Sequence, residues 1–529
     1  MAMAMAMAKL LSFLFYLLLH SNVGEGFDVR QHLSTVSRYS AAKELANNGY
    51  VPSTIPEECT PIHLNLVARH GTRSPTKKRM RELDRLASHL EMLVNDAKHE
   101  AEKGNLSLEK IPAWLWGWLS PWKGKQRGGE LISKGEDELY HLGIRIRERF
   151  MDLFNEEYHP DVFTIKATQV PRASASAVAF GMGLFSERGS LGPGKHRAFS
   201  VISESRASDL LLRFYDICET YKQYRENREP AVGKLKEPIL DQISSALVSR
   251  YQLNFTRQDV ASLWFLCKQE ASLLDITDQA CGLFTPSEVS LLEWTDDLEV
   301  FILKGYGKSI NYRMGLPLLQ DVVQSMEQAI RASEEHNDPG TYEKARLRFA
   351  HAETVVPFSC LLGLFLEEAE LARLKHEQPL ELPPKPPQER NWRGNVVAPF
   401  AGNNMLVLYT CPTNNTSKYF VQVMHNEVPV PLLGCDGSDF CPFEVFKVSH
   451  PSNSQDTSGD ETLTLNSVQR IYVLQEKIVN PHLAHNYNSL CSAKLEEPQP
   501  ISVTSKFFYW LFSKKIDDEA SSHKTKLEL

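Results

Sequence analysis

A histidine between two arginines follows the first predicted strand of the chain and could attack a phosphate group. Residues 69–75 read Arg-His-Gly-Thr-Arg-Ser-Pro, directly after the apolar segment 62–67. The neutral imidazole of His70 would not repel an anionic phosphate, and the glycine after it would let the backbone approach closely. Arg69 and Arg73 can hold the anionic oxygens with forked donors. The heptapeptide therefore predicts phosphoryl transfer through a phosphohistidine, whereas each cation taken singly would be read as an ordinary surface charge.

The triplet His-Ala-Glu at residues 351–353 could supply the acid that this chemistry needs. It follows the apolar segment 345–350. His351 could donate to the phosphate, and Glu353 could protonate the leaving alcohol oxygen as a general acid. A solvated pair at a strand end is the alternative. The carboxyl end of a parallel strand favours the catalytic interpretation, because ligand sites of α/β proteins lie there.

Further cations indicate a strongly anionic ligand. Arg172 follows the apolar segment 162–168 and would begin a helix, where it either joins the phosphate site or is exposed. Between residues 69 and 81 there are six arginines and lysines and no carboxylate. A chain of net charge −8 that gathers cations beside its nucleophile would focus a polyphosphate there. We expect Lys77 or Lys78 to contact a substrate phosphate, and the net charge argues against nucleic acid as a partner.

Segments that read as strands alternate with helical segments around these motifs, as in an α/β sheet. Predicted strands lie at 62–67, 162–168, 199–202, 345–350, 405–409, 419–424 and 470–474, and predicted helices at 80–103, 134–154, 172–186 and 354–374. From 208 to 334 apolar residues recur at helical spacing without a strand, which predicts an inserted helical lobe.

These patterns divide the chain into five predicted parts. They are a signal peptide at 1–26, a first part of an α/β core at 45–205 with loops that reach the cap, a helical cap at 206–335, a second part of the core at 336–500, and a C-terminal tail at 501–529.

The N-terminal segment is typical of a secretory signal peptide. Lys9 precedes the apolar run 10–19, which is short for a membrane span, and an uncleaved membrane anchor is the alternative. The chain ends in Lys-Leu-Glu-Leu at 526–529, which resembles a retrieval signal of the endoplasmic reticulum or is an ordinary charged tail. We expect a protein of the secretory pathway, extracellular, vacuolar or in the lumen of the endoplasmic reticulum, with no membrane span after signal removal. Nothing in the sequence argues against a monomer.

Cysteines and glycan acceptors fit that route. The chain has nine cysteines without a Cys-x-x-Cys pattern, so four disulfides and one free thiol are the simplest count. Acceptor asparagines for N-linked glycans are Asn105, Asn254, Asn414 and Asn415.

The motifs together resemble those of the histidine acid phosphatases, which form branch two of the histidine phosphatase superfamily. The segment 69–75 is similar to the family signature, 129–147 to its Gly-x-Leu-Thr-x-x-Gly helix, and 168–177 to its arginine-bearing strand-helix junction. His-Ala-Glu in place of His-Asp resembles the multiple inositol polyphosphate phosphatases, a group that includes phytases. The likeness runs from about Cys59 to Cys491.

The resemblance implies a fold, a mechanism and a set of site residues. The fold would be a phosphoglycerate-mutase-like α/β core, with a mixed, mostly parallel sheet flanked by helices and an inserted all-helical cap. The enzyme would need no metal or cofactor, and its substrates would be inositol hexakisphosphate and lower inositol polyphosphates. By the same resemblance His70 is the nucleophile and Glu353 the proton donor, and the phosphate ligands are Arg69, Arg73, Arg172 and His351. Alanine at 352, where the family's usual acid stands, puts the identity of the acid in doubt.

The resemblance also implies disulfides. The pairs would be Cys59–Cys411, Cys218–Cys491, Cys267–Cys281 and Cys435–Cys441, with Cys360 free.

Other functions compete with this reading. A broad acid phosphatase or a bisphosphoglycerate phosphatase would use the same motif on other substrates. A polyphosphate-binding protein without catalysis would be expected to have lost His70 or the acid, and both are present. A metallophosphatase would need a cluster of aspartate and histidine ligands, which the motif search does not find.

Overall fold

The computed structural model describes residues 27–46, 51–104, 107–335, 341–375, 378–412, 417–432, 435, 437–447 and 486–492. The predicted signal peptide, the strand at 470–474, the tail at 501–529 and the acceptors Asn105, Asn414 and Asn415 lie outside these residues. Within them, none of the helices combines the length and the apolar character that crossing a membrane requires.

A seven-stranded sheet forms the core, in the order β2-β3-β1-β4-β5-β6 with β7 paired to β5. Its strands are β1 (Thr60–Arg69), β2 (Phe163–Ala167), β3 (Ala345–Ala350), β4 (Asn403–Thr410), β5 (Tyr419–His425), β6 (Val428–Pro429) and β7 (Phe440–Pro442). Strands β2, β3 and β1 run parallel, and β4 and β5 are antiparallel to their neighbours. The sheet is mixed, as predicted, but its antiparallel share is larger than expected. The connection between β4 and β5 is short, and a short connection joins antiparallel strands.

Helices cover both faces of the sheet because the central strands are apolar on both sides. On one face α4 (Ser133–Arg149) and α5 (Pro171–Leu184) pack their buried leucines, alanines and phenylalanines against β1, β2 and β3. On the other face α11 (Leu316–Glu334) and α12 (Ala352–Leu361) pack against β1 and β4. Helix α11 lies within the range predicted as cap, yet it belongs to this layer of the sheet.

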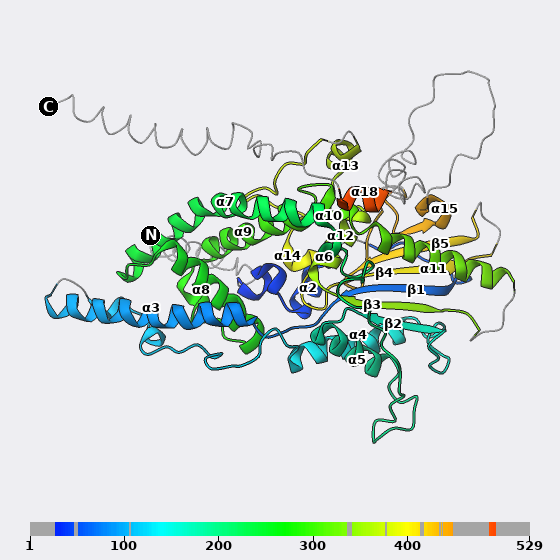
Figure 1. The fold of residues 1–529 in the computed structure, drawn as a ribbon, viewed down its shortest axis with the longest axis horizontal. Coiled ribbons are helices and arrows are strands. Elements are labelled where there is room, and N and C mark those ends of the chain that lie inside the picture. Colours follow the sequence, from blue (N-terminus) through cyan, green and yellow to red (C-terminus); the bar gives the residue numbers. More distant parts are fainter. Residues whose placement is uncertain are drawn as a thin grey trace, which may run out of the picture.

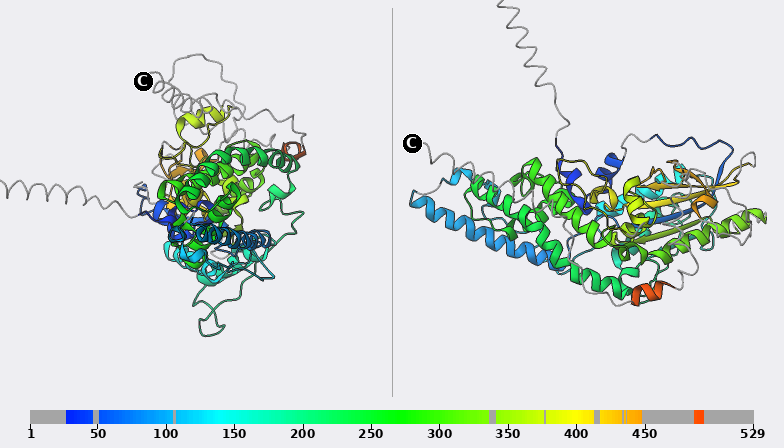
Figure 2. Two further views of the ribbon diagram at one scale, coloured as in Figure 1. Left: turned by 90° about the vertical axis from the view of Figure 1, so that its left-hand side faces the viewer. Right: turned by 90° about the horizontal axis from the view of Figure 1, so that it is seen from above.

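A helical lobe extends from one end of the sheet. It contains α7 (Glu219–Tyr251), α8 (Arg257–Gln269), α9 (Pro286–Lys304) and α3 (Lys77–Glu102), which share one apolar cluster. Figure 1 shows these helices on the left and the sheet on the right, and the right-hand view of Figure 2 shows the same division from above. Helix α3 follows the motif at residues 69–75 directly, so the segment that contains His70 leads from the sheet into the lobe.

The remaining elements are short. They are η1 (Val29–His32), η2 (Ser34–Val36), α2 (Tyr39–Ala46), η3 (Leu108–Lys110), η4 (Ala113–Leu115), α6 (Phe214–Ile217), η5 (Glu270–Leu274), η6 (Cys281–Leu283), α10 (Ile310–Arg313), α13 (Glu368–Lys375), α14 (Gly394–Val397), α15 (Phe443–Phe446) and α18 (Asn486–Ser492).

Two predicted elements were wrong in detail. The helix expected at 354–374 is two helices, α12 and α13, because Gly363 and Phe365 between them have positive φ angles of 72° and 66°. The strand expected at 199–202 is a single bridge in which Ile202 pairs with Lys166 at the edge of β2.

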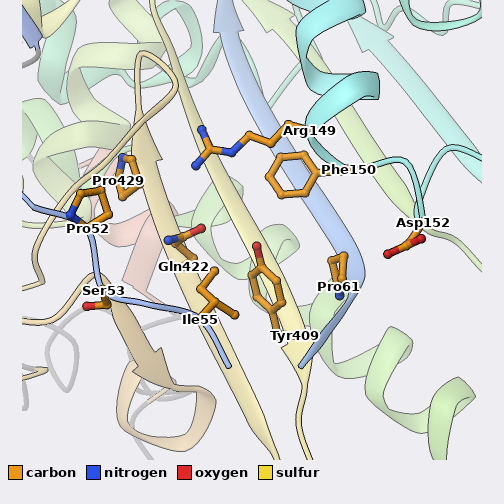
Figure 3. A pocket seen from close by; sticks show the side chains of 10 residues that line it. All are labelled: Pro52, Ser53, Ile55, Pro61, Arg149, Phe150, Asp152, Tyr409, Gln422 and Pro429. Atoms are coloured by element: carbon orange, nitrogen blue, oxygen red, sulfur yellow. The ribbon is translucent and has the colours of Figure 1, made fainter. Parts of the chain in front are cut away.

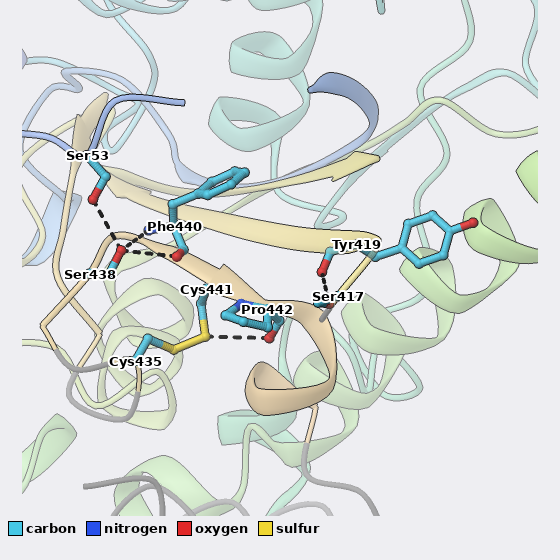
Figure 4. Close-up of a disulfide and its surroundings, with 8 residues drawn as sticks. All are labelled: Ser53, Ser417, Tyr419, Cys435, Ser438, Phe440, Cys441 and Pro442. Carbon is cyan, nitrogen blue, oxygen red and sulfur yellow. Dashed lines mark hydrogen bonds between the residues drawn. A yellow bond between two sulfur atoms is a disulfide. The ribbon is translucent and has the colours of Figure 1, made fainter. Parts of the chain in front are cut away.

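Four disulfides are present, in the same pairs that the family resemblance implied, and Cys360 is buried and free. Cys59 and Cys411 directly flank Thr60 and Thr410, which are register partners in β1 and β4, so the sheet brings the two sulfurs together. The disulfide between Cys435 and Cys441 closes the turn before β7 (Figure 4).

Candidate active site

The three segments singled out from the sequence meet at the carboxyl ends of the parallel strands. Arg69 pairs with Ala350 in the register of β1 and β3, and the amide of His70 donates to the carbonyl of Ala350 at 3.0 Å. This alignment sets the rings of His70 and His351 5.4 Å apart, edge to face. Arg172 enters the same region from α5, which begins just beyond the end of β2.

The buried ring of His70 is held in the form that a nucleophile needs. Its Nδ1 lies 2.9 Å from the carbonyl oxygen of Gly71, which can only accept, so Nδ1 carries the hydrogen and Nε2 the lone pair. Burial lowers the pKa of His70 well below its usual value, and the charges of Arg69, His351, Arg172 and Arg73 lower it further. The imidazole is therefore neutral even in mildly acidic solution.

The loop after His70 is fixed against α4 and α5. The amide of Gly71 donates to Ser176 Oγ at 3.1 Å, and the amide of Thr72 donates to Glu138 Oε2 at 2.8 Å. Glu138 also accepts from the hydroxyl of Thr72. Gly71 and Gly135 touch backbone to backbone, so a side chain at either position would clash. His70 thus lies on a segment with little freedom to move.

The guanidinium group of Arg69 is anchored at one end and free at the other. Its Nη1 donates to the carbonyls of Thr35 at 2.5 Å and Ala398 at 2.7 Å, and the group lies 4.4 Å from the ring centre of Phe400. Burial and the neighbouring charge of Arg73 lower the pKa of Arg69 to about 9. The Nε atom is buried and has no partner.

Arg73 and Arg172 repeat this arrangement. Arg73 donates from Nη1 to the carbonyl of Ser74 at 2.8 Å, and burial together with the charge of Arg172 lowers its pKa to about 10. Arg172 lies 3.4 Å from both the carbonyl of Gly129 and Nδ1 of His351. Both arginines have a buried Nε atom without a partner. Buried donors without partners, among like charges that lower each other's pKa, fit an anion.

His351 is held on both sides of its ring. It is the N-cap residue of α12, and its Nε2 lies 2.9 Å from Thr168 Oγ1. Each ring nitrogen also faces an arginine: Nδ1 lies 3.4 Å from a terminal nitrogen of Arg172, and Nε2 lies 3.5 Å from one of Arg213. Burial and the charge of Arg172 lower the pKa of His351 to about 3.

Glu353 lies in the first turn of α12, where an ion pair with Lys304 holds it. Lys304 is the last residue of α9, and its Nζ is 3.0 Å from Glu353 Oε1. Burial alone would raise the pKa of Glu353, but the charges of Lys304 and His351 outweigh burial and lower it. Glu353 is therefore a carboxylate in the free enzyme, whereas the predicted role requires a proton on it.

The lysines predicted to contact substrate lie at the rim. Lys77 and Lys78 are exposed in the first turn of α3, and neither has an ion-pair partner among the described residues. They are the nearest part of α3 to the motif. The acceptor Asn254 is exposed in the turn between α7 and α8, which suits a glycan.

Two cations of the site came from segments without a motif. Arg213 precedes α6, reaches to 3.5 Å from His351 Nε2, forms an ion pair with Asp216, and has a buried Nε atom without a partner. The other is Lys304. The segments around both residues read simply as helical lobe, so no sequence signal marked them.

A cavity of about 410 Å³ lies at the other end of the sheet. It is lined by Pro61 at the start of β1, by Arg149 and Phe150 at the end of α4, and by Tyr409 and Gln422 (Figure 3). Strand β1 has ten residues and spans roughly 30 Å, so this cavity is remote from His70.

Relatives of known activity match the chain over most of its length. Multiple inositol polyphosphate phosphatase 1 of Homo sapiens is 27% identical over 396 residues, which cover 72% of this chain and 77% of that protein. The thiamine-repressible acid phosphatase pho4 of Schizosaccharomyces pombe is 26% identical over 479 residues, which cover 88% of this chain and 92% of that protein.

Solved structures and a family model agree on the fold. The phytase from D. castellii gives a TM-score of 0.57 at 18% identity and covers 79% of this chain and 84% of that chain. The multiple inositol polyphosphate phosphatase of Bifidobacterium longum, in complex with inositol hexasulfate, gives 0.55 at 20% identity and covers 79% and 97%. These likenesses confirm the predicted fold class. The model of the histidine phosphatase superfamily, branch 2, matches residues 62–426, from β1 to just beyond β5, and the chain belongs to that family.

Proposed function

We propose that this protein hydrolyses phosphate monoesters of inositol hexakisphosphate and lower inositol polyphosphates through a phosphohistidine at His70. The observation that carries the proposal is the buried, neutral His70 among three arginines whose Nε donors have no partner. An uncharged nucleophile beside unused cationic donors suits an anionic phosphate better than any neutral substrate.

The reaction needs three actions from these residues. Arg69, Arg73 and Arg172 hold the non-bridging oxygens and neutralise the charge that builds up on them. Nε2 of His70 attacks phosphorus while Gly71 keeps the hydrogen on Nδ1. The bond from phosphorus to the ester oxygen breaks, and that oxygen takes a proton from Glu353. Water then cleaves the phosphohistidine and returns a proton to Glu353.

A substrate with several phosphates is supported by the cations beyond the reacting centre. Arg213 approaches from the segment before α6 and Lys304 from the helical lobe, and Lys77 and Lys78 at the rim have no ion-pair partner in the described part of the chain. A single phosphate would leave these charges unused. Among the relatives, the human protein is named for inositol polyphosphates, which fits such a surplus of cations.

A broad acid phosphatase is the second candidate, because relatives in Schizosaccharomyces pombe are named acid phosphatases. The two candidates differ in the ranking of kcat/KM across inositol phosphates, bisphosphoglycerate and simple monoesters. A clear preference for inositol hexakisphosphate is expected. Equal values for all substrates would refute the polyphosphate assignment.

The catalytic role of His70 has a direct test. H70A should lose phosphate release by at least about a thousandfold and should no longer trap labelled phosphate on the protein in acid-quenched reactions. H99A, at an exposed position of α3, is the matched control and should behave as wild type. Chromatography of the inositol products would identify the phosphates removed. Phosphate release by H70A at the wild-type rate would overturn the mechanism.

The four disulfides are consistent with a secreted or lumenal protein, since they form in oxidising compartments. We propose on this ground that the protein enters the secretory pathway. Exposed Asn254 should then carry a glycan when the protein is made in a eukaryotic host. Enzymatic deglycosylation should lower the mass of the wild type, and N254Q should lack that share of the change.

A further inference from the structure

The ion pair between Lys304 and Glu353 links the helical lobe to the catalytic layer of the sheet. Lys304 is the last residue of α9, and Glu353 lies in the first turn of α12. The Nζ atom of Lys304 is 3.0 Å from Oε1 of Glu353. Both side chains are partly accessible, with 20% and 29% of their surfaces exposed. An anion in the site can therefore reach the ammonium group without unfolding either helix.

The surroundings of Glu353 explain why this pair matters. Charged or titratable side chains that interact electrostatically with Glu353 come from every neighbouring element: Lys304, His351, Arg69, Arg73, Arg172, Tyr215, Tyr221 and Arg225. The carboxylate also lies at the N-terminus of a helix, which favours negative charge. All of these groups except the phenols of Tyr215 and Tyr221 favour the ionised form of Glu353.

One phosphate bound over His70 would neutralise the three arginines but would leave the ion pair between Lys304 and Glu353 intact. We propose that Lys304 is a specificity-determining residue: it holds Glu353 as a carboxylate in the empty site, and a second phosphate of the substrate takes its ammonium group and frees Glu353 to carry a proton. This inference deepens the proposed function and rests on it. A monoester with a single phosphate brings no second anion, so it leaves the acid unprotonated.

The proton balance is closed within the catalytic cycle. Glu353, once released from Lys304, takes a proton from solvent. The nitrogen–phosphorus bond forms at His70 Nε2, the phosphorus–oxygen bond breaks, and the leaving oxygen receives the proton of Glu353. Attacking water then gives one proton back to Glu353 and its oxygen to phosphorus. When the products leave and Lys304 pairs with Glu353 again, this proton returns to solvent. The sum is one ester and one water consumed, and one alcohol and one phosphate formed.

The test compares K304M with wild type on inositol hexakisphosphate and on two monoesters. Glycerol phosphate has an alkoxide leaving group that needs the acid, and p-nitrophenyl phosphate has one that needs little protonation. In K304M the pKa of Glu353 should rise because a nearby cation is gone. At mildly acidic pH, kcat/KM for glycerol phosphate should therefore rise about tenfold for each unit by which the pKa of Glu353 rises. The decline of kcat/KM with increasing pH should move to higher pH.

The other substrates make the result specific. For p-nitrophenyl phosphate, K304M should stay within about twofold of wild type. For inositol hexakisphosphate KM should rise, so its preference over glycerol phosphate should fall at least about tenfold. K304R keeps the charge and should keep the preference, and K308M removes an exposed lysine from the same lobe as the matched control.

Two outcomes would overturn the inference. An equal loss on all three substrates would make Lys304 a merely structural residue, and unchanged kinetics on all three would remove its role altogether. Failure of the proposed function is visible separately, in wild type: no phosphate released from inositol hexakisphosphate would refute that substrate. The comparison of the two monoesters would still decide whether Lys304 controls the acid.

Discussion

Replacing Gly135 by alanine should displace the loop that carries His70, the proposed nucleophile. Gly135 lies in the first turn of α4, and a Cβ atom there would stand 2.6 Å from the amide nitrogen of Thr72 and closer still to its carbonyl oxygen. That amide is the donor to Glu138. Real Cβ atoms do not come so close to backbone, so either α4 or the segment next to His70 must shift.

The magnitude follows from two opposing effects. Alanine is a better helix former than glycine by up to about 1 kcal/mol, which favours the variant. Overpacking typically costs about 1–3 kcal/mol, and the upper part of that range applies because backbone atoms have no side-chain rotation to relieve the clash. We expect G135A to lower the free energy of unfolding by about 1–2 kcal/mol. A shift of His70 by about 1 Å should lower kcat on the order of a hundredfold.

Urea unfolding and steady-state phosphate release would measure the two effects. G233A is the matched control, because Gly233 is exposed within α7 and a Cβ there would meet no atom within 4 Å. It should raise the free energy of unfolding by about 0.5–1 kcal/mol without changing kcat. Wild-type stability and kcat in G135A would refute the idea that this glycine contact positions the nucleophile.

Further predictions concern stability and the rim of the site. Burial raises the pKa of Glu270 from 4.5 to about 7, so between these pH values the folded protein keeps a proton that the unfolded chain has lost. The free energy of unfolding should therefore fall as pH rises through this window, and E270Q should remove on the order of 2 kcal/mol of that fall. Urea unfolding of both proteins at several pH values would measure the difference. The bond between Cys267 and Cys281 closes a short loop in the lobe, and replacing both by serine should cost about 3 kcal/mol, measured in the same way. K77M and K78M should each raise KM for inositol hexakisphosphate about two- to fivefold with kcat retained, and an unchanged KM would exclude that lysine from substrate contact.

The sequence was most informative where chemistry and strand ends coincide. The apolar run before Arg69 and the run before His351 predicted β1 and β3, and β3 has the predicted bounds. Parallel strands bring their carboxyl ends to one edge, so the two motifs had to meet once both strands were parallel. The hydrogen bond that fixes the tautomer of His70 came from the structure, which shows the carbonyl of Gly71 as its acceptor.

Contacts between distant helices left no mark in the sequence. Lys304 is the last residue of helix α9, a position where lysine is common, and the residues next to it in the sequence do not indicate that Glu353 lies opposite. Arg213 forms an ion pair with Asp216 three residues later, which reads as local helix chemistry. The sequence did not show that α3 belongs to the lobe, because its apolar face could pack equally well against the lobe or against the sheet. Such pairings depend on tertiary packing rather than on local periodicity.

The two groups of cations in the site differ in how they are held, and this difference matches two separate tasks. Arg69 is tied to main-chain carbonyls, which stay in place whether or not substrate is bound. Arg213, before α6, and Lys304, at the end of α9, are instead paired with carboxylates, Asp216 and Glu353, and an ion pair can exchange one anion for another. A site built in this way would bind the reacting phosphate in a fixed geometry and let the remaining phosphates of the substrate decide whether the acid is released. Selectivity for polyphosphates would then arise at the protonation step as much as in binding.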